Sequence, residues 1–183
     1  MTWSIRSIVK TMLPILAALT SLEIAMGLVL SSFQSTLFYY PSLLILVPVI
    51  IGTAGSLGST LSARLSTAFH LGLLEFRYDN HHLIGNILST IALSITIFPL
   101  IGIATWAIAT WAFEPILSPF QILSITTLSG LLISIFTVIV ALVTTYGSYR
   151  LKLDPDDVVI PIVTNLSDVF GIFVFLAIVL LLL

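Results

Sequence analysis

Residues 24–63 read IAMGLVLSSFQSTLFYYPSLLILVPVIIGTAGSLGSTLSA and contain no Asp, Glu, Lys or Arg. A helix crosses a bilayer with about 20 mostly apolar residues, so this run is too long for a single span. The cluster SSFQST at 31–36 is typical of a turn, and we expect two helices to meet there. This stretch therefore predicts a pair of membrane-spanning helices.

The rest of the chain divides in the same way. Glu114-Pro115 and Ser118-Pro119 interrupt a second long apolar run, and the acidic segment DPDD at 154–157 precedes a third. We expect an all-α integral membrane protein, a single transmembrane domain over residues 1–183 without a soluble regulatory domain. Pro48 and the three glycines that follow it predict that the second helix is kinked or locally unwound. The expected spans are 8–31, 38–69, 83–112, 120–149 and 157–182.

The composition agrees with this class and excludes several functions. Hydrophobic residues make up 58% of the chain and charged residues 8%, whereas soluble proteins carry about 25% charged residues. A net charge of -2 without a basic cluster does not fit nucleic-acid binding. The absence of Cys excludes thiol catalysis and thiolate metal sites. No Walker motif or intramembrane-enzyme signature occurs, so we expect neither an enzyme nor an ATPase domain.

The positive charges predict the orientation of the helices. The connections at 32–37 and 113–119 hold no Lys or Arg, and all six positive charges fall at the opposite ends of the spans. Because positive charges favour the cytoplasmic side, we expect the N-terminus inside and the C-terminus outside, in a multi-pass protein of the cell membrane. The charges are Arg6, Lys10, Arg64, Arg77, Arg150 and Lys152.

The last span carries a polar face at membrane depth. Pro161, Thr164, Asn165 and Asp168 are spaced i, i+3, i+4 and i+7, and therefore share one side of a helix. Asp168 would lie about 16 Å from the helix start, midway through the hydrocarbon core. It could accept hydrogen bonds that fix helix packing, or it could mark an ion path, as intramembrane carboxylates usually do.

The second span has a face of small residues. Gly52, Ser56 and Thr60 are spaced i, i+4 and i+8, with Gly55 on the adjacent stripe. Such a face is typical of close helix packing, and it would also suit a narrow path lined by hydroxyl groups and carbonyl oxygens. Glu23, in the first span, could line the same path or hydrogen-bond to the second helix.

Acidic residues gather at the cytoplasmic start of the last span. Asp154, Asp156 and Asp157 fit helix capping and a favourable interaction with the helix dipole. Asp154 and Asp157 could equally form an acidic mouth that collects cations.

Two of these segments resemble the MgtE magnesium transporters and their eukaryotic solute-carrier relatives. PVIIGTAGSLGSTLSARLSTAFHLG at 48–72 resembles the family's second transmembrane helix, and its part 62–68 is closest to the eukaryotic branch. DPDDVVIPIVTNLSDVFG at 154–171 and Gly85-Asn86 also fit the family pattern. The sequence departs from that pattern at two positions. Gly55-Ser56 stands where the family has Gly-Asn, and Thr60 where the bacterial motif has Gln.

The resemblance implies a five-helix unit that forms a homodimer with a Mg²⁺ path lined by the second and fifth helices. The family's central metal-binding Asp falls on Asp168, and the backbone carbonyl one turn earlier falls on Thr164. Mg²⁺ is then the transported ion and a candidate structural ion. Whether such a protein is a channel or a Na⁺- or H⁺-coupled exchanger stays open, and the alternative is a non-transporting membrane subunit of a larger complex.

Overall fold

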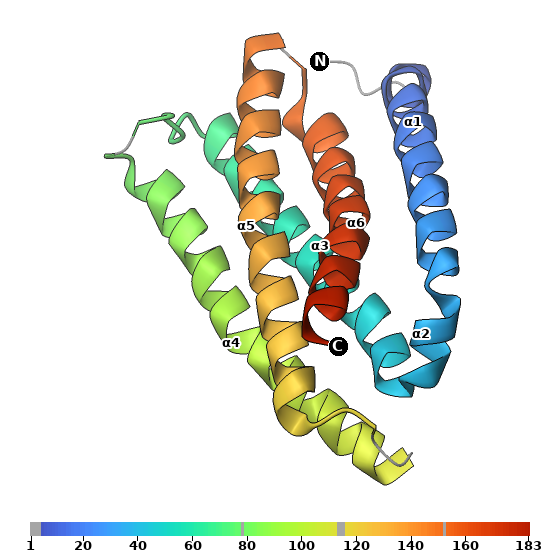
Figure 1. The fold of residues 1–183 in the computed structure, drawn as a ribbon. Coiled ribbons are helices and arrows are strands. Elements are labelled where there is room, and N and C mark those ends of the chain that lie inside the picture. The colour runs from blue at the N-terminus through green and yellow to red at the C-terminus, as the bar shows by residue number, and fades with distance from the viewer. Residues whose placement is uncertain (1–4, 78, 113–115, 152) are drawn as a thin grey trace.

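The computed structural model describes residues 5–77, 79–112, 116–151 and 153–183, without the side chains of residues 5–8, 11 and 156. Within these ranges the chain is helical and contains no strand, as Figure 1 shows. The helices are α1 (Ile5–Ser32), α2 (Gln34–Tyr39), α3 (Pro41–His70), α4 (His81–Ala112), α5 (Pro119–Leu151) and α6 (Pro155–Leu182).

Five of these helices are long and apolar enough to cross a membrane, which confirms the predicted multi-pass architecture. Each predicted boundary lies within three residues of the observed one. The short α2 was not predicted. It occupies part of the expected turn between the first two spans, because the segment after Ser32 winds through one more helical stretch before Pro41 begins α3. The helix α3 continues past Pro48 without interruption, so local unwinding is not found there.

Side chains and a glycine define several helix ends. After α3, Gly72 has a φ of +69°, and Leu73 N–H donates to the carbonyl of Ala68, which together close the helix as a Schellman motif. Asn80 Oδ1 accepts from the Leu83 N–H at 2.8 Å and caps α4. The break predicted at Ser118-Pro119 is confirmed by the start of α5. The other predicted break, Glu114-Pro115, lies outside the described residues.

The contacts of α6 decide which groups can surround its polar face. It packs against α1, α3 and α5, while α4 packs against α3 and α5. In Figure 1, α1 (blue) and α4 (green) stand at opposite edges of the bundle, with α3, α5 and α6 between them. Groups on α6 can therefore meet groups from three other spans.

The apolar core has two halves with a polar layer between them. One half includes Ile50 of α3 and Phe175 of α6, and the other includes Leu61 of α3 and Val163 of α6. The segments of α3, α5 and α6 between these halves carry small or polar residues, which places the polar layer near the middle of the bundle. These residues are Gly55, Gly58, Ser134, Thr137, Thr164, Ser167 and Asp168.

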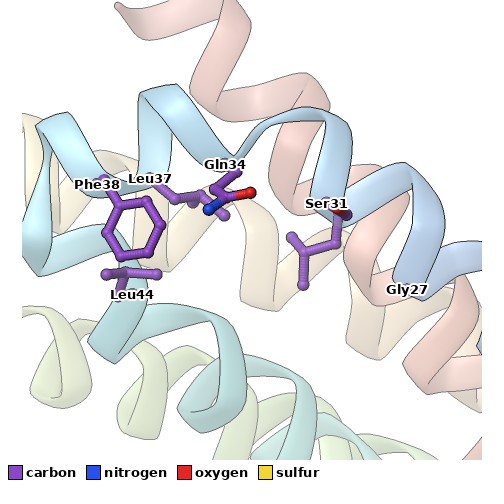
Figure 2. Close-up of a pocket in the computed structure, with 7 residues that line it drawn as sticks. Gly27, Ser31, Gln34, Leu37, Phe38 and Leu44 are labelled. Atoms are coloured by element: carbon purple, nitrogen blue, oxygen red, sulfur yellow. The ribbon is translucent and has the colours of Figure 1, made fainter.

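A pocket of about 310 Å³ lies at the corner where α1, α2 and α3 meet. Figure 2 shows Gln34 and Ser31 among its mostly apolar lining. No ionisable residue lines it, and it lies at the end of α3 away from His70, so it is separate from the polar layer.

Candidate functional site

The helices α3 and α6 pack closely at Asp168, where Gly55 faces the carboxylate. A Cβ atom placed on Gly55 would lie 3.2 Å from Asp168 Oδ1 and 3.4 Å from Thr164 Cγ2. A carbon–oxygen contact at that distance is tight, so the missing side chain of Gly55 provides the room that the carboxylate occupies. The structure thus brings together three residues predicted to share one site: Gly55, Thr164 and Asp168.

The Asp168 carboxylate is half-buried and has no counter-charge among the described residues. In the part of the chain that the structure describes, no side-chain donor hydrogen-bonds to it and no Lys, Arg or His forms an ion pair with it. Arg64 of α3 lines a groove between α3 and α4. Because an uncompensated charge at membrane depth is costly, the carboxylate fits a role with a mobile cation better than a packing role.

A second carboxylate lies near Asp168. The less exposed residues of α1 recur at spacings of three or four and form one stripe, which faces the bundle. Glu23 lies in the middle of this inward stripe, between Leu19 and Met26. Since α1 packs on α6, this stripe brings Glu23 within electrostatic range of Asp168. The hydrogen bond to the second transmembrane helix considered for Glu23 is not found among the described residues.

The polar layer also contains a buried hydroxyl pair that was not predicted. Thr137 of α5 and Ser167 of α6 are hydrogen-bonded at 2.7 Å, and Ser167 also donates to the carbonyl of Val163 at 2.6 Å. Gly58 of α3 lies directly under this pair, since a Cβ there would collide with Thr137. These contacts fix the rotation of α6 next to Asp168. Small residues recur along α5 at Thr126, Gly130 and Ser134, and Thr137 continues this stripe by one turn, which is the signal in the sequence that could have found it.

Two further predicted residues of α6, Pro161 and Asn165, change the hydrogen bonding of its backbone carbonyls. Pro161 has no N–H to donate to the carbonyl of Asp157, which leaves that carbonyl without its usual helical partner. Asn165 donates its amide to the carbonyl of Pro161 at 2.9 Å and keeps its side-chain oxygen as an acceptor. Both residues lie on the turns of α6 that precede Asp168.

The small residues of α3 divide into two groups. Gly55 and Gly58 are buried against α6, whereas Gly52 and Ser56 are exposed in the single chain, and Gly52 has no atom within 4 Å of its Cβ position. Ser56 donates to the carbonyl of Gly52 at 2.8 Å. Thr60 lines the α3–α4 groove, so the single chain does not bring it to Asp168.

The acidic start of α6 is tied to the end of α3. Asp154 Oδ1 lies 3.5 Å from His70 Nε2, and the carbonyl of Asp154 accepts from the Asp157 N–H at 3.2 Å. Asp154 and Asp157 therefore lie together at the end of α6 that precedes Pro161. The turn at Asp154 fits helix initiation, and the position at the end of the bundle fits a cation-collecting mouth, so both interpretations remain compatible.

The single chain does not complete a metal site. Among the described residues, no group of three or more His, Asp or Glu side chains lies close enough to hold an ion. The spans instead supply the Asp168 carboxylate beside Gly55 of α3, and Glu23 on the stripe of α1 that packs on α6. This arrangement is suited to a hydrated ion or to a site completed by another copy.

Comparison with known proteins also supports a role in cation transport. A family model described as divalent cation transporter, MgtE, matches residues 47–178, a range that includes Gly55 and Asp168. Solute carrier family 41 member 3 from Rattus norvegicus is 26% identical over 152 residues, covering 78% of this chain and 32% of that protein. The protein of the same name from Mus musculus is 25% identical over 169 residues, covering 87% and 33%. The chain thus spans about a third of the length of these relatives.

Proposed function

We propose that this chain, which belongs to the MgtE family of divalent cation transporters, carries Mg²⁺ across the cell membrane along α3 and α6. The observation that carries this proposal is Asp168, a carboxylate at the middle of a membrane-spanning helix with no protein counter-charge in the described residues. A divalent cation is the counter-charge that the arrangement lacks.

The chemistry of Mg²⁺ suits a site with few protein ligands. Mg²⁺ loses its water reluctantly and is usually held by one or two carboxylates with several waters retained. Asp168 supplies the direct or water-mediated ligand, and the carbonyl of Thr164 lies one turn earlier on the same helix. Gly55 allows the backbone of α3 to approach the ion path without a side chain in the way.

Glu23 belongs to this path as a second carboxylate. Two negative groups from α1 and α6 repel one another unless a cation lies between them or water separates them. Their proximity in one chain therefore raises the local attraction for a divalent ion above that of a single Asp. Of the two roles considered for Glu23, the proposal therefore assigns it the one in the path.

Two copies would complete the path. The exposed face of α3, with Gly52 and Ser56, is small and polar where a lipid-facing helix would be apolar. A two-fold axis beside this face would bring two Asp168 carboxylates and two glycine faces around one ion. The path would continue past Asn165 and Pro161 to the mouth formed by Asp154 and Asp157.

The membrane potential and the ion gradient set the direction of passive transport through such a path. A doubly charged ion that moves inward through 100 mV gains about 4.6 kcal/mol, so influx through a channel needs no ATP. An exchanger coupled to Na⁺ or H⁺ would use the same residues. Loss of flux in Na⁺-free medium at constant voltage would identify the exchanger.

Uptake into liposomes tests the proposal. We expect purified wild-type protein to admit Mg²⁺, and Asp168→Asn, which keeps the shape but removes the charge, to reduce the rate by at least about tenfold, or roughly 1.4 kcal/mol in the barrier. Glu75→Gln, in the exposed α3–α4 connection, is the matched control and should transport normally. Equal flux in wild type and Asp168→Asn would refute Asp168 as the central ligand.

The second candidate is a non-transporting membrane subunit. The exposed faces of α1 and α3 favour it, because both could pack against other chains in a larger complex. It gives no reason for the unpaired Asp168. Absence of flux for every divalent ion tested, in well-folded wild-type protein, would favour this candidate over transport.

A further inference from the structure

A groove of about 550 Å³ between α3 and α4 has features that the proposed ion path does not use. Its polar lining comprises Arg64 and Thr67 of α3 and His82 and Asn86 of α4, with Thr60 at its deeper end. No Asp or Glu lines it. The groove therefore presents a cation without an acidic neighbour in its wall.

Arg64 is exposed and has no ion-pair partner among the residues that the structure describes. It lies six residues before the end of α3 at His70, which is roughly 9 Å along the helix. An Arg at this depth extends toward the level of the lipid headgroups. Its unpaired guanidinium is suited to a phosphate, which it can bind through two parallel hydrogen bonds.

The two residues of α4 add donors at the same level. His82 is exposed at the start of the helix. Asn86 donates one amide hydrogen to the carbonyl of His82 at 2.7 Å, which leaves the second hydrogen free for a ligand. Arg64, His82 and Asn86 can thus surround one anionic group from two helices.

Below these donors the same face of α4 carries two exposed leucines. Leu93 and Leu100 follow His82 and Asn86 at helical spacing and are 49% and 58% exposed. Ser89 and Thr96 beside them donate their hydroxyl hydrogens to carbonyls of the helix itself. A polar group at the membrane surface with exposed leucines beneath it matches the shape of a phospholipid better than that of a free ion. The groove also lies on the side that carries the positive charges, where anionic lipids are enriched if that side is cytoplasmic.

We propose that the α3–α4 groove binds the phosphate headgroup of an anionic phospholipid through Arg64, His82 and Asn86. The acyl chains then lie along Leu93 and Leu100. The site is separate from Asp168, so lipid binding and ion transport can be tested independently.

Native mass spectrometry of the purified full chain, incubated with equal amounts of phosphatidylglycerol and phosphatidylcholine, tests this site. We expect wild type to retain phosphatidylglycerol in preference, and Arg64→Ala to lose about fivefold of that preference. Arg150→Ala removes one positive charge from the same side of the bundle, outside the groove, and should keep it. Equal retention of the two lipids by wild type would overturn the proposal, as would an unchanged preference in Arg64→Ala.

His82→Phe is a second, independent test of the site in case Arg64→Ala misfolds. It keeps the bulk of an exposed ring and removes both nitrogen atoms, so it should lower the preference two- to threefold with an unchanged melting temperature. An unchanged preference in this variant would count against the site.

Displacement of the lipid by millimolar inorganic phosphate would indicate a free-anion site instead. A disulfide between two copies through His82→Cys would show that a second copy covers the groove. Either result would overturn the lipid assignment.

Discussion

The surroundings of Glu23 become clear only from the packing of α1 on α6. A carboxylate among the apolar residues of α1 would be expensive in lipid. Its place on the inward stripe of α1 instead turns it toward α6, within electrostatic range of Asp168. Mg²⁺ passing Asp168 would therefore meet two negative groups in each copy.

Removing the charge of Glu23 should weaken ion binding more than it slows saturated transport. We expect Glu23→Gln to raise the Mg²⁺ concentration for half-maximal uptake by about fivefold to tenfold, because one of two attracting charges is lost. The measurement is the concentration dependence of uptake in liposomes.

The conservative variant separates charge from shape. Glu23→Asp keeps the charge and should stay within about twofold of wild type. If Glu23→Gln shows an unchanged concentration dependence while wild type transports Mg²⁺, then Glu23 lies outside the path, although the role of Asp168 would stand.

At the scale of elements, the close approach of α3 and α6 depends on Gly55. In Gly55→Ala the new methyl group would lie 3.2 Å from Asp168 Oδ1, so the carboxylate must move by a few tenths of an ångström. We expect Mg²⁺ uptake to fall on the order of tenfold, since small displacements of a ligand group are costly. Alanine is the better helix former by up to about 1 kcal/mol, so the melting temperature should fall little.

Gly147→Ala in α5 is the matched control for this change. A Cβ at Gly147 meets nothing within 4 Å, so uptake should stay normal and stability should rise slightly. Normal uptake by Gly55→Ala would mean that the carboxylate moves away freely and that its position against α3 is not needed.

The sequence predicted where each span runs better than how the spans face one another. The lengths of the apolar runs located all five spans, because the bilayer fixes their length and polarity. The rotation of each helix depends on contacts with residues far away in the chain. Hence the Thr137–Ser167 bond was not predicted, and the sequence did not choose between the two roles considered for Glu23. Thr60, predicted to line the path, borders the α3–α4 groove in the single chain.

At the scale of the whole molecule, the outer face of α3 is the surface that a second copy would cover. Gly52 and Ser56 are exposed there, and no contact within the chain requires a glycine at position 52. The apolar faces of α1 and α4 are suited to lipid, as shown by the exposed Leu28 and Leu100. The small, polar face of α3 and the apolar faces of α1 and α4 together predict that the dimer axis lies beside α3.

The absence of Cys makes this prediction directly testable. A single Gly52→Cys substitution introduces the only thiol, and two such thiols form a disulfide only when their Cα atoms come within about 7 Å. We expect oxidation to convert Gly52→Cys into a covalent dimer in lipid bilayers at low protein density. If the two α3 helices are held further apart around the ion, a short thiol crosslinker should give the same product. Leu100→Cys, on the lipid-facing side of α4, should remain monomeric under the same conditions. If both variants crosslink equally, the contact is random collision, and if only Leu100→Cys crosslinks, the axis lies beside α4 and Asp168 must act within a single copy.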